Sequence, residues 1–140
     1  MNTISASVER ISITRHSLGI FFIRFIAGLI FFMHGWDKLH SIPNVISMFQ
    51  LLGMPWWLAY VATVLEVVGG AALMLGVAMR SFGLLLGVEM VIAALTVNAH
   101  MPRGFHGVEF ELLLAAVSFG IAFAGNNMLS LYAWQRSSIE

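Results

Sequence analysis

The stretch LGIFFIRFIAGLIFFMHGWDK, residues 18–38, decides the class of this 140-residue chain. It is apolar up to Met33 except for Arg24, and about 20 such residues in an α-helix cross the roughly 30 Å of hydrocarbon in a bilayer. The apolar residues are continuous and do not alternate with polar ones, which argues against a strand of a membrane β-barrel. No small-residue cleavage site follows, so the stretch is not a cleaved signal sequence. It predicts a transmembrane helix.

Three further apolar runs follow the first and extend the prediction to the whole chain. We expect an all-α membrane protein, a four-transmembrane-helix bundle with helices at about 18–38, 56–79, 82–100 and 108–126. This single membrane domain is expected to span residues 18–131, between a polar N-terminal tail of residues 1–17 and a C-terminal tail of residues 132–140. The long first connection is predicted to hold a short interfacial helix at residues 44–52, and a tight turn is predicted around Met79–Ser81.

The composition excludes several classes of protein. The chain is 59% hydrophobic and only 10% charged, which is too few charges to cover the surface of a soluble domain of this size. Its net charge is zero, so it has no basic surface for nucleic acid. It contains no Cys, which excludes disulfides, thiolate metal sites and iron–sulfur clusters.

The distribution of basic residues predicts the orientation. An even number of spans places both tails on one side, and this side collects Arg10, Arg15, Arg80 and Arg136. The opposite side collects Lys38 and Arg103. Because cytoplasmic loops carry an excess of Lys and Arg, we expect cytoplasmic N and C termini.

Ionisable side chains interrupt every apolar run, although such groups are costly at bilayer depth and mark paired or functional positions. On each predicted helix they share a face with small residues at helical spacing. We therefore expect polar faces that point inward and apolar faces that contact lipid. The candidate site residues on the inward faces are Arg24, His34, Lys38, Glu66, Glu89, His100 and Glu111.

Three of these residues are expected at a similar depth, since each helix rises 1.5 Å per residue from its point of entry. Arg24 is predicted to pair with Glu66 or Glu89, and the carboxylate left over is predicted to carry a proton. A purely structural ion pair and a Lys38 that extends to water are the simpler alternatives. A second polar group toward the loops is expected from His34, Lys38, His100, His106, Glu109 and Glu111.

Several motifs together resemble the DoxX family of small four-helix bacterial membrane proteins. They are Arg24-x3-Gly28, His34-Gly35-x2-Lys38, Gly53-Met54-Pro55, Glu66-Val67-Val68-Gly69-Gly70 and Glu109-Phe110-Glu111, and the resemblance extends over most of residues 18–131. It implies a multi-pass protein of the bacterial inner (plasma) membrane. It also implies a role as an oxidoreductase component linked to quinones, sulfur oxidation or thiol stress.

We therefore predict a membrane protein that binds a quinone or phenol-like redox partner in its polar core and works with a membrane redox partner protein. Glu66 and His34 are predicted to line one cavity that opens toward the loops at 34–55 and 100–107, with the first loop as a lid. Hydrogen-bond donors are expected from Arg24, His34, Lys38 and His100, and proton carriers from Glu66, Glu89 and Glu111. Trp36, Trp56 and Trp57 are expected to offer aromatic surface to a planar ligand.

Two other functions stay open at this point. One is a small proton-coupled transporter, which would need a homodimer because four helices are few. The other is a scaffold subunit of a membrane redox complex. No motif indicates a bound cofactor, because G-x-G-x-x-G and Cys ligands are absent, so a quinone is the expected small molecule. Haem between His34 and His100, and a metal held by two His and a Glu, are the remaining ligand alternatives.

Overall fold

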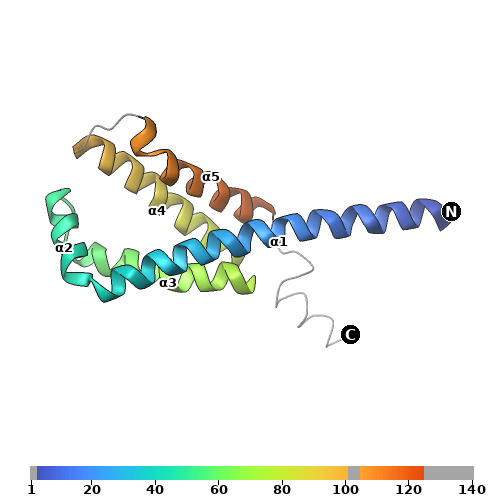
Figure 1. The fold of residues 1–140 in the computed structure, drawn as a ribbon, viewed down its shortest axis with the longest axis horizontal. Helices are drawn as coiled ribbons and strands as arrows, with labels where there is room; N and C mark the ends of the chain where they lie inside the picture. Colours follow the sequence, from blue (N-terminus) through green and yellow to red (C-terminus); the bar gives the residue numbers. More distant parts are fainter. Residues whose placement is uncertain (1–2, 101–104, 125–140) are drawn as a thin grey trace.

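The computed structural model describes the backbone of residues 3–100 and 105–124 and the side chains of residues 18–100 and 105–124. Its elements are α1 (Thr3–His40), α2 (Ile42–Leu51), α3 (Trp57–Leu75), α4 (Met79–His100), the short 3₁₀ helix η1 (Phe105–Gly107) and α5 (Glu109–Ala124) (Figure 1). The all-α prediction is therefore confirmed. The short helix expected at 44–52 is present as α2.

Within the described residues, three helices are long and apolar enough to cross a membrane: Leu18–His40, Trp57–Leu75 and Met79–His100. The fourth helix of the bundle, α5, has 16 residues in the described part of the chain and runs beside α4 (Figure 1). The protein is a multi-pass membrane protein.

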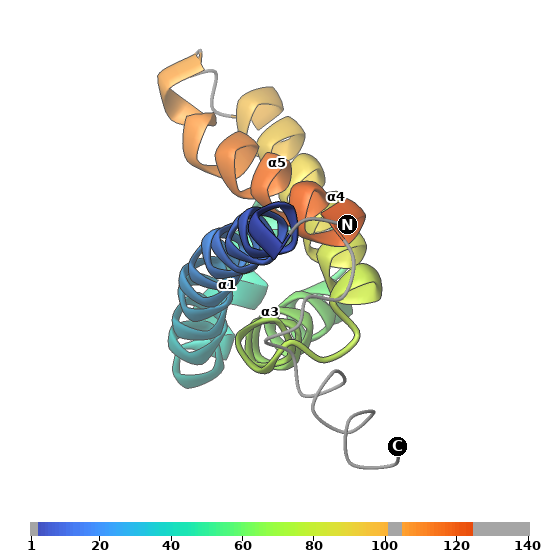
Figure 2. The ribbon, with the colours of Figure 1, turned by 90° about the vertical axis from the view of Figure 1, so that its right-hand side faces the viewer.

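The helices form two closely packed antiparallel pairs. The most extensive contacts are those of α1 with α3 and of α4 with α5, whereas α3 meets α4 and α1 meets α5 over smaller areas. Figure 2 shows this arrangement along α1, with α3 on one side of it and α4 and α5 on the other. The short α2 contacts α3 and lies across the end of the bundle opposite the N-terminus.

Glycine allows the backbones of α1 and α3 to touch. A Cβ atom added to Gly28 would lie 2.7 Å from the carbonyl oxygen of Gly70, and one added to Gly35 would lie 2.7 Å from the backbone nitrogen of Val67. A side chain at either position would overlap the partner helix. The hydrophobic effect does not drive helices together in lipid. Small residues at the interface allow close van der Waals packing instead.

Glycines also allow α4 and α5 to pack closely. A Cβ atom at Gly83 would lie 2.7 Å from the carbonyl oxygen of Ser118, and one at Gly87 would lie 2.7 Å from the ring of Phe119. Around these glycines, α4 buries Met79, Leu86 and Met90 against the core. Close packing of complementary surfaces thus holds each helix pair together, and the outer faces of the helices remain apolar.

The turn between α3 and α4 lies earlier than predicted. It was expected around Met79–Ser81, but α3 ends at Leu75 and α4 begins at Met79. Gly76 adopts a left-handed backbone with φ of 73°, and the Val77 and Gly76 N–H groups donate to the carbonyls of Ala72 and Leu73. This arrangement is a Schellman motif, in which glycine is favoured at the left-handed position because it has no Cβ atom to clash. Gly76 was therefore the overlooked stop signal.

The first helix is longer than predicted. Residues 1–17 were expected to form a polar tail, and the sequence there is polar, yet the helix is continuous from Thr3 to His40. Its 38 residues span about 57 Å at 1.5 Å per residue, well beyond one hydrocarbon layer. Figure 1 shows its N-terminal part projecting beyond the other helices.

Candidate functional site

An ion pair joins α1 to α3 within the bundle. The Nζ atom of Lys38 lies 2.7 Å from Oε1 of Glu66, and the Glu66 side chain is only 3% exposed. Side chains on a helix lean toward its N-terminus, and α1 and α3 are antiparallel. Lys38 therefore leans along α1 toward the membrane centre, and Glu66 leans toward it from the opposite direction. The result is a buried, charge-assisted hydrogen bond.

Arg24 does not make the predicted ion pair with Glu66 or Glu89. It is 1% exposed, and its guanidinium donates to the carbonyl oxygens of Leu73 and Met74 at 2.7 and 2.8 Å. These carbonyls belong to the last turn of α3, where a helix carries partial negative charge, and the Leu73 carbonyl also accepts from the Gly76 N–H. Without water in the hydrocarbon layer these acceptors need a donor from the protein, and Arg24 leans toward them.

Glu89 of α4 lies close to the Lys38–Glu66 pair. It is partly buried and interacts electrostatically with both Glu66 and Lys38. Its Oε2 atom is buried without a hydrogen-bond partner among the described residues, and the same holds for Oε2 of Glu66. Lys38 thus pairs with Glu66 while Glu89 lies nearby, and each carboxyl group has one buried oxygen without a hydrogen-bond partner among the described residues. Such atoms are costly unless a proton, water or ligand satisfies them.

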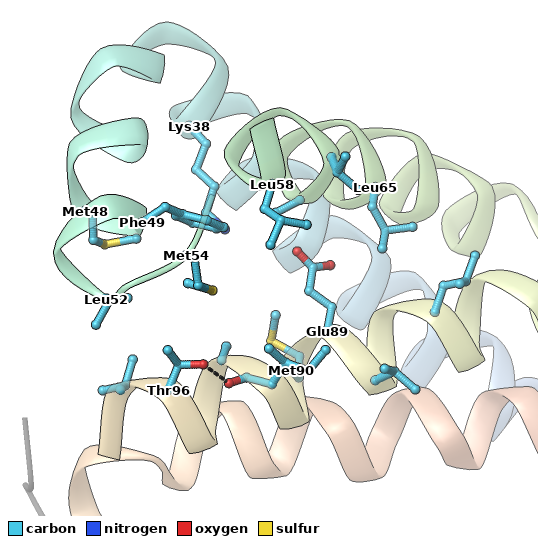
Figure 3. A pocket seen from close by; sticks show the side chains of 17 residues that line it. Lys38, Met48, Phe49, Leu52, Met54, Leu58, Leu65, Glu89, Met90 and Thr96 are labelled. Carbon is cyan, nitrogen blue, oxygen red and sulfur yellow. Dashed lines mark hydrogen bonds between the residues drawn. The ribbon is translucent and has the colours of Figure 1, made fainter. Parts of the chain in front are cut away.

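A cavity of about 310 Å³ lies between α2, α3 and α4, with Lys38 reaching it from α1. Figure 3 shows the Glu89 carboxyl group pointing into this space from α4, toward Leu58 and Leu65 of α3. The polar side chains on its wall are Lys38, Glu89 and Thr96, and all its other lining residues are apolar. An apolar cavity with a few convergent polar groups is the usual form of a small-molecule site.

The structure corrects the predicted composition of this cavity. His34 was expected to line it with Glu66, but His34 is exposed and stacks on Phe110 of α5 with ring centroids 5.8 Å apart. Gly35 faces α3, and one residue corresponds to a rotation of about 100° around the helix, so His34 is turned toward α5. Glu66 is paired with Lys38 and is not among the residues that line the cavity.

The remaining predicted site residues lie apart from this cavity. His100 is exposed, with Nδ1 3.0 Å from the carbonyl oxygen of Thr96. Glu111 is partly buried on α5, and His106 pairs with Glu109 at 3.2 Å on the surface. No group of three or more His, Asp or Glu side chains that could hold a metal is present in residues 18–100 and 105–124. The two-His-and-carboxylate alternative therefore has no assembled site there.

The sequence analysis missed the part of the cavity wall that the first connection supplies. Met48 and Phe49 of α2 line the cavity together with Met54 of the same connection, and none of the three tryptophans expected there lines it. Trp36, Trp56 and Trp57 are all exposed. The available signal was the spacing of Val45 and Phe49, which are one turn apart and both buried. A helix with such a face packs it against the core.

Comparisons with known proteins identify the family of this chain. The DoxX family model matches residues 19–99. A protein of Bacillus subtilis (strain 168) named "Putative oxidoreductase CatD" is 35% identical over 115 residues, which cover 81% of this chain and 84% of that protein. No solved structure matches. The family match covers more than half of the chain and the relative is similar along most of its length, so this chain belongs to the DoxX family.

Proposed function

We propose that this protein binds a quinone or phenol-like redox molecule in the cavity between α2, α3 and α4, as one component of a membrane redox system. The head group would lie beside Lys38 and Glu89, and the ring would lie among the apolar side chains of the wall. The redox assignment is supported by the relative that is named an oxidoreductase. The binding site is supported by the chemistry of the cavity.

The observation that carries the proposal is the unused Oε2 atom of Glu89. It is buried, has no hydrogen-bond partner among the described residues, and belongs to a side chain that points into the cavity (Figure 3). A phenol or quinol hydroxyl would donate to a carboxylate there, and a quinone carbonyl would accept from the protonated carboxyl. The missing hydrogen bond is thus one that a ligand can supply.

The neighbouring charges suit proton transfer. Two-electron reduction of a quinone to a quinol takes up two protons, one on each oxygen. Glu89 lies near the Lys38–Glu66 ion pair, so one of the two protons can move from the Glu89 carboxyl to a ligand oxygen while Lys38 stabilises the carboxylate that remains. The electrons would come from a redox enzyme that associates with the protein.

We further propose that the protein resides in the bacterial inner membrane with both termini in the cytoplasm, as part of a larger redox complex. The support is the excess of Arg on the tail side, which includes Arg80 at the start of α4. A partner enzyme on the cytoplasmic side would then face the projecting N-terminal part of α1.

Binding is tested by titrating a quinone into the protein in lipid nanodiscs and following the quenching of Trp fluorescence. Glu89→Leu removes the polar group and is expected to weaken binding about tenfold or more, since a lost hydrogen bond to a buried charged group costs about 1.5–3 kcal/mol. Asp37→Asn is the matched control, because Asp37 is an exposed carboxylate that does not line the cavity. Equal affinity of the wild type and Glu89→Leu would contradict the proposal.

A further inference from the structure

The rim of the cavity is apolar throughout. Five lining residues are also substantially exposed on the outside of the molecule, and they therefore mark where the cavity opens. They are Met48 of α2, Val61 of α3, and Leu85, Val88 and Ile92 of α4, with exposed fractions of 46–52%. No charged or polar side chain among the lining residues is exposed to this degree. A rim of this kind faces hydrocarbon more favourably than water.

The rim on α4 belongs to its lipid-facing stripe. Leu85, Val88 and Ile92 follow the 3-4 spacing of one helix face, and Leu95, which is 68% exposed, continues this face beyond the cavity. In a helix that spans the membrane such a face contacts lipid. The opening between α3 and α4 therefore lies at the depth of the hydrocarbon.

The end of the cavity toward the first connection is closed by side chains. Phe49 and Leu52 are both only 9% exposed, and they line the cavity together with the partly buried Met54. Figure 3 shows them between Lys38 and the last turns of α4. The expected opening toward the loop at 34–55 is therefore occupied by the apolar face of α2.

The polar groups lie inward of the rim. Glu89 follows Val88 directly, and the rotation of about 100° per residue turns its side chain from the lipid-facing stripe into the cavity. Lys38 approaches from α1, which packs against α3 and does not contribute to the rim. A molecule that fills this space has a polar group at its inner end and an apolar part that leaves through the rim.

We infer that the ligand enters laterally from the bilayer between α3 and α4, and that it is a quinone with an isoprenoid tail, held with its head at Glu89 and its tail in the lipid. The inference rests on the proposed function for the head group and adds the tail and the route. A water-soluble quinone or catechol would use the same head site, but it would leave the apolar rim without a partner.

The test compares two quinones that share one head group, a tail-less one and one with four isoprene units, in nanodiscs of phosphatidylcholine and phosphatidylglycerol. Affinities are expressed as mole fractions in the membrane, so that partitioning of the tail into lipid does not count as binding. We expect the wild type to bind the tailed quinone at least about tenfold more tightly. Fluorescence quenching and displacement of one quinone by the other provide the readout.

A rim variant, Val88→Phe with Ile92→Phe, places two larger rings across the opening. It is expected to lower the affinity for the tailed quinone about tenfold and to leave the affinity for the tail-less one within about twofold. Leu95→Phe is the matched control, since Leu95 lies on the same stripe but does not line the cavity. It should change neither affinity.

The outcomes separate this inference from the proposed function. If the wild type binds the tail-less quinone as tightly as the tailed one in membrane units, lateral binding of the tail is wrong, while quinone binding itself stands. If neither quinone binds, the proposed function fails and the inference fails with it. The comparison of the two quinones uses the wild type alone, so it decides whether the tail is bound even if the rim variant does not fold.

Discussion

Lys38 and Glu66 form a partly buried ion pair between antiparallel helices, with 2.7 Å between Nζ and Oε1. The pair contributes to stability only while both charges are present, because a lone charge in this environment is costly. Lys38→Met is therefore expected to lower the melting temperature in detergent, at a cost of about 3–5 kcal/mol if Glu66 stays ionised. Lys38→Met combined with Glu66→Met should be less destabilised than Lys38→Met alone.

The double-mutant comparison distinguishes this account from simple loss of packing. Two independent packing defects would add, so that the double variant melts lowest. A melting temperature of the double variant below that of both single variants would show that the two residues do not depend on one another.

Arg24 satisfies the end of α3, and its removal should loosen that end. Arg24→Gln shortens the side chain and is expected to cost about 2–4 kcal/mol, since two hydrogen bonds from a charged donor are lost at about 1.5–3 kcal/mol each and part is regained. Arg80→Gln, at an exposed position in the first turn of α4, is the control. Thermal unfolding in detergent measures both, and equal melting temperatures would contradict the role given to Arg24.

The glycine contacts between α1 and α3 predict that an alanine at Gly28 destabilises the protein, and Gly19 on the same helix provides the control. Gly28→Ala and Gly19→Ala place the same methyl group on the same helix, but Gly28 abuts Gly70 and Gly19 has nothing within 4 Å. Overpacking typically costs about 1–3 kcal/mol, so Gly28→Ala should lower the melting temperature. Gly19→Ala should leave it unchanged or raise it, because alanine favours helix.

The predicted orientation is tested with a reporter fused after Glu140. The basic residues on the tail side predict a cytoplasmic readout, and a fusion in the loop that contains Arg103 should give the opposite result. A periplasmic signal from the C-terminal fusion would reverse the orientation and would place a partner enzyme on the other side of the membrane.

The sequence predicted the parts of the fold that depend on composition and helical period. The apolar runs located the four helices, and the inward faces centred on Arg24, Gly28 and Glu66 are buried as expected. The turn at Gly76 was misplaced by about three residues because the apolar run continues through it, so that only the glycine marks the end of α3.

The pairing of charges was not predictable from depth alone. Arg24 and Lys38 lie on one face of α1, and the expected depths placed Arg24 level with Glu66 and Glu89. The direction in which each side chain leaves its helix, together with the register set by Gly28 and Gly35, instead joins Lys38 to Glu66. Such a register depends on backbone contacts between helices, which periodicity within one helix does not contain.

The most direct test of the central claim is photolabelling with a quinone that carries an azido group on its ring. The labelled protein is digested and the modified peptides are identified by mass spectrometry, with and without an excess of unlabelled quinone. The account predicts saturable labelling of the cavity wall, in the peptides around Met48–Ala62 and Val88–Val97. Labelling confined to α5 around Phe110, or labelling that unlabelled quinone does not compete, would contradict it.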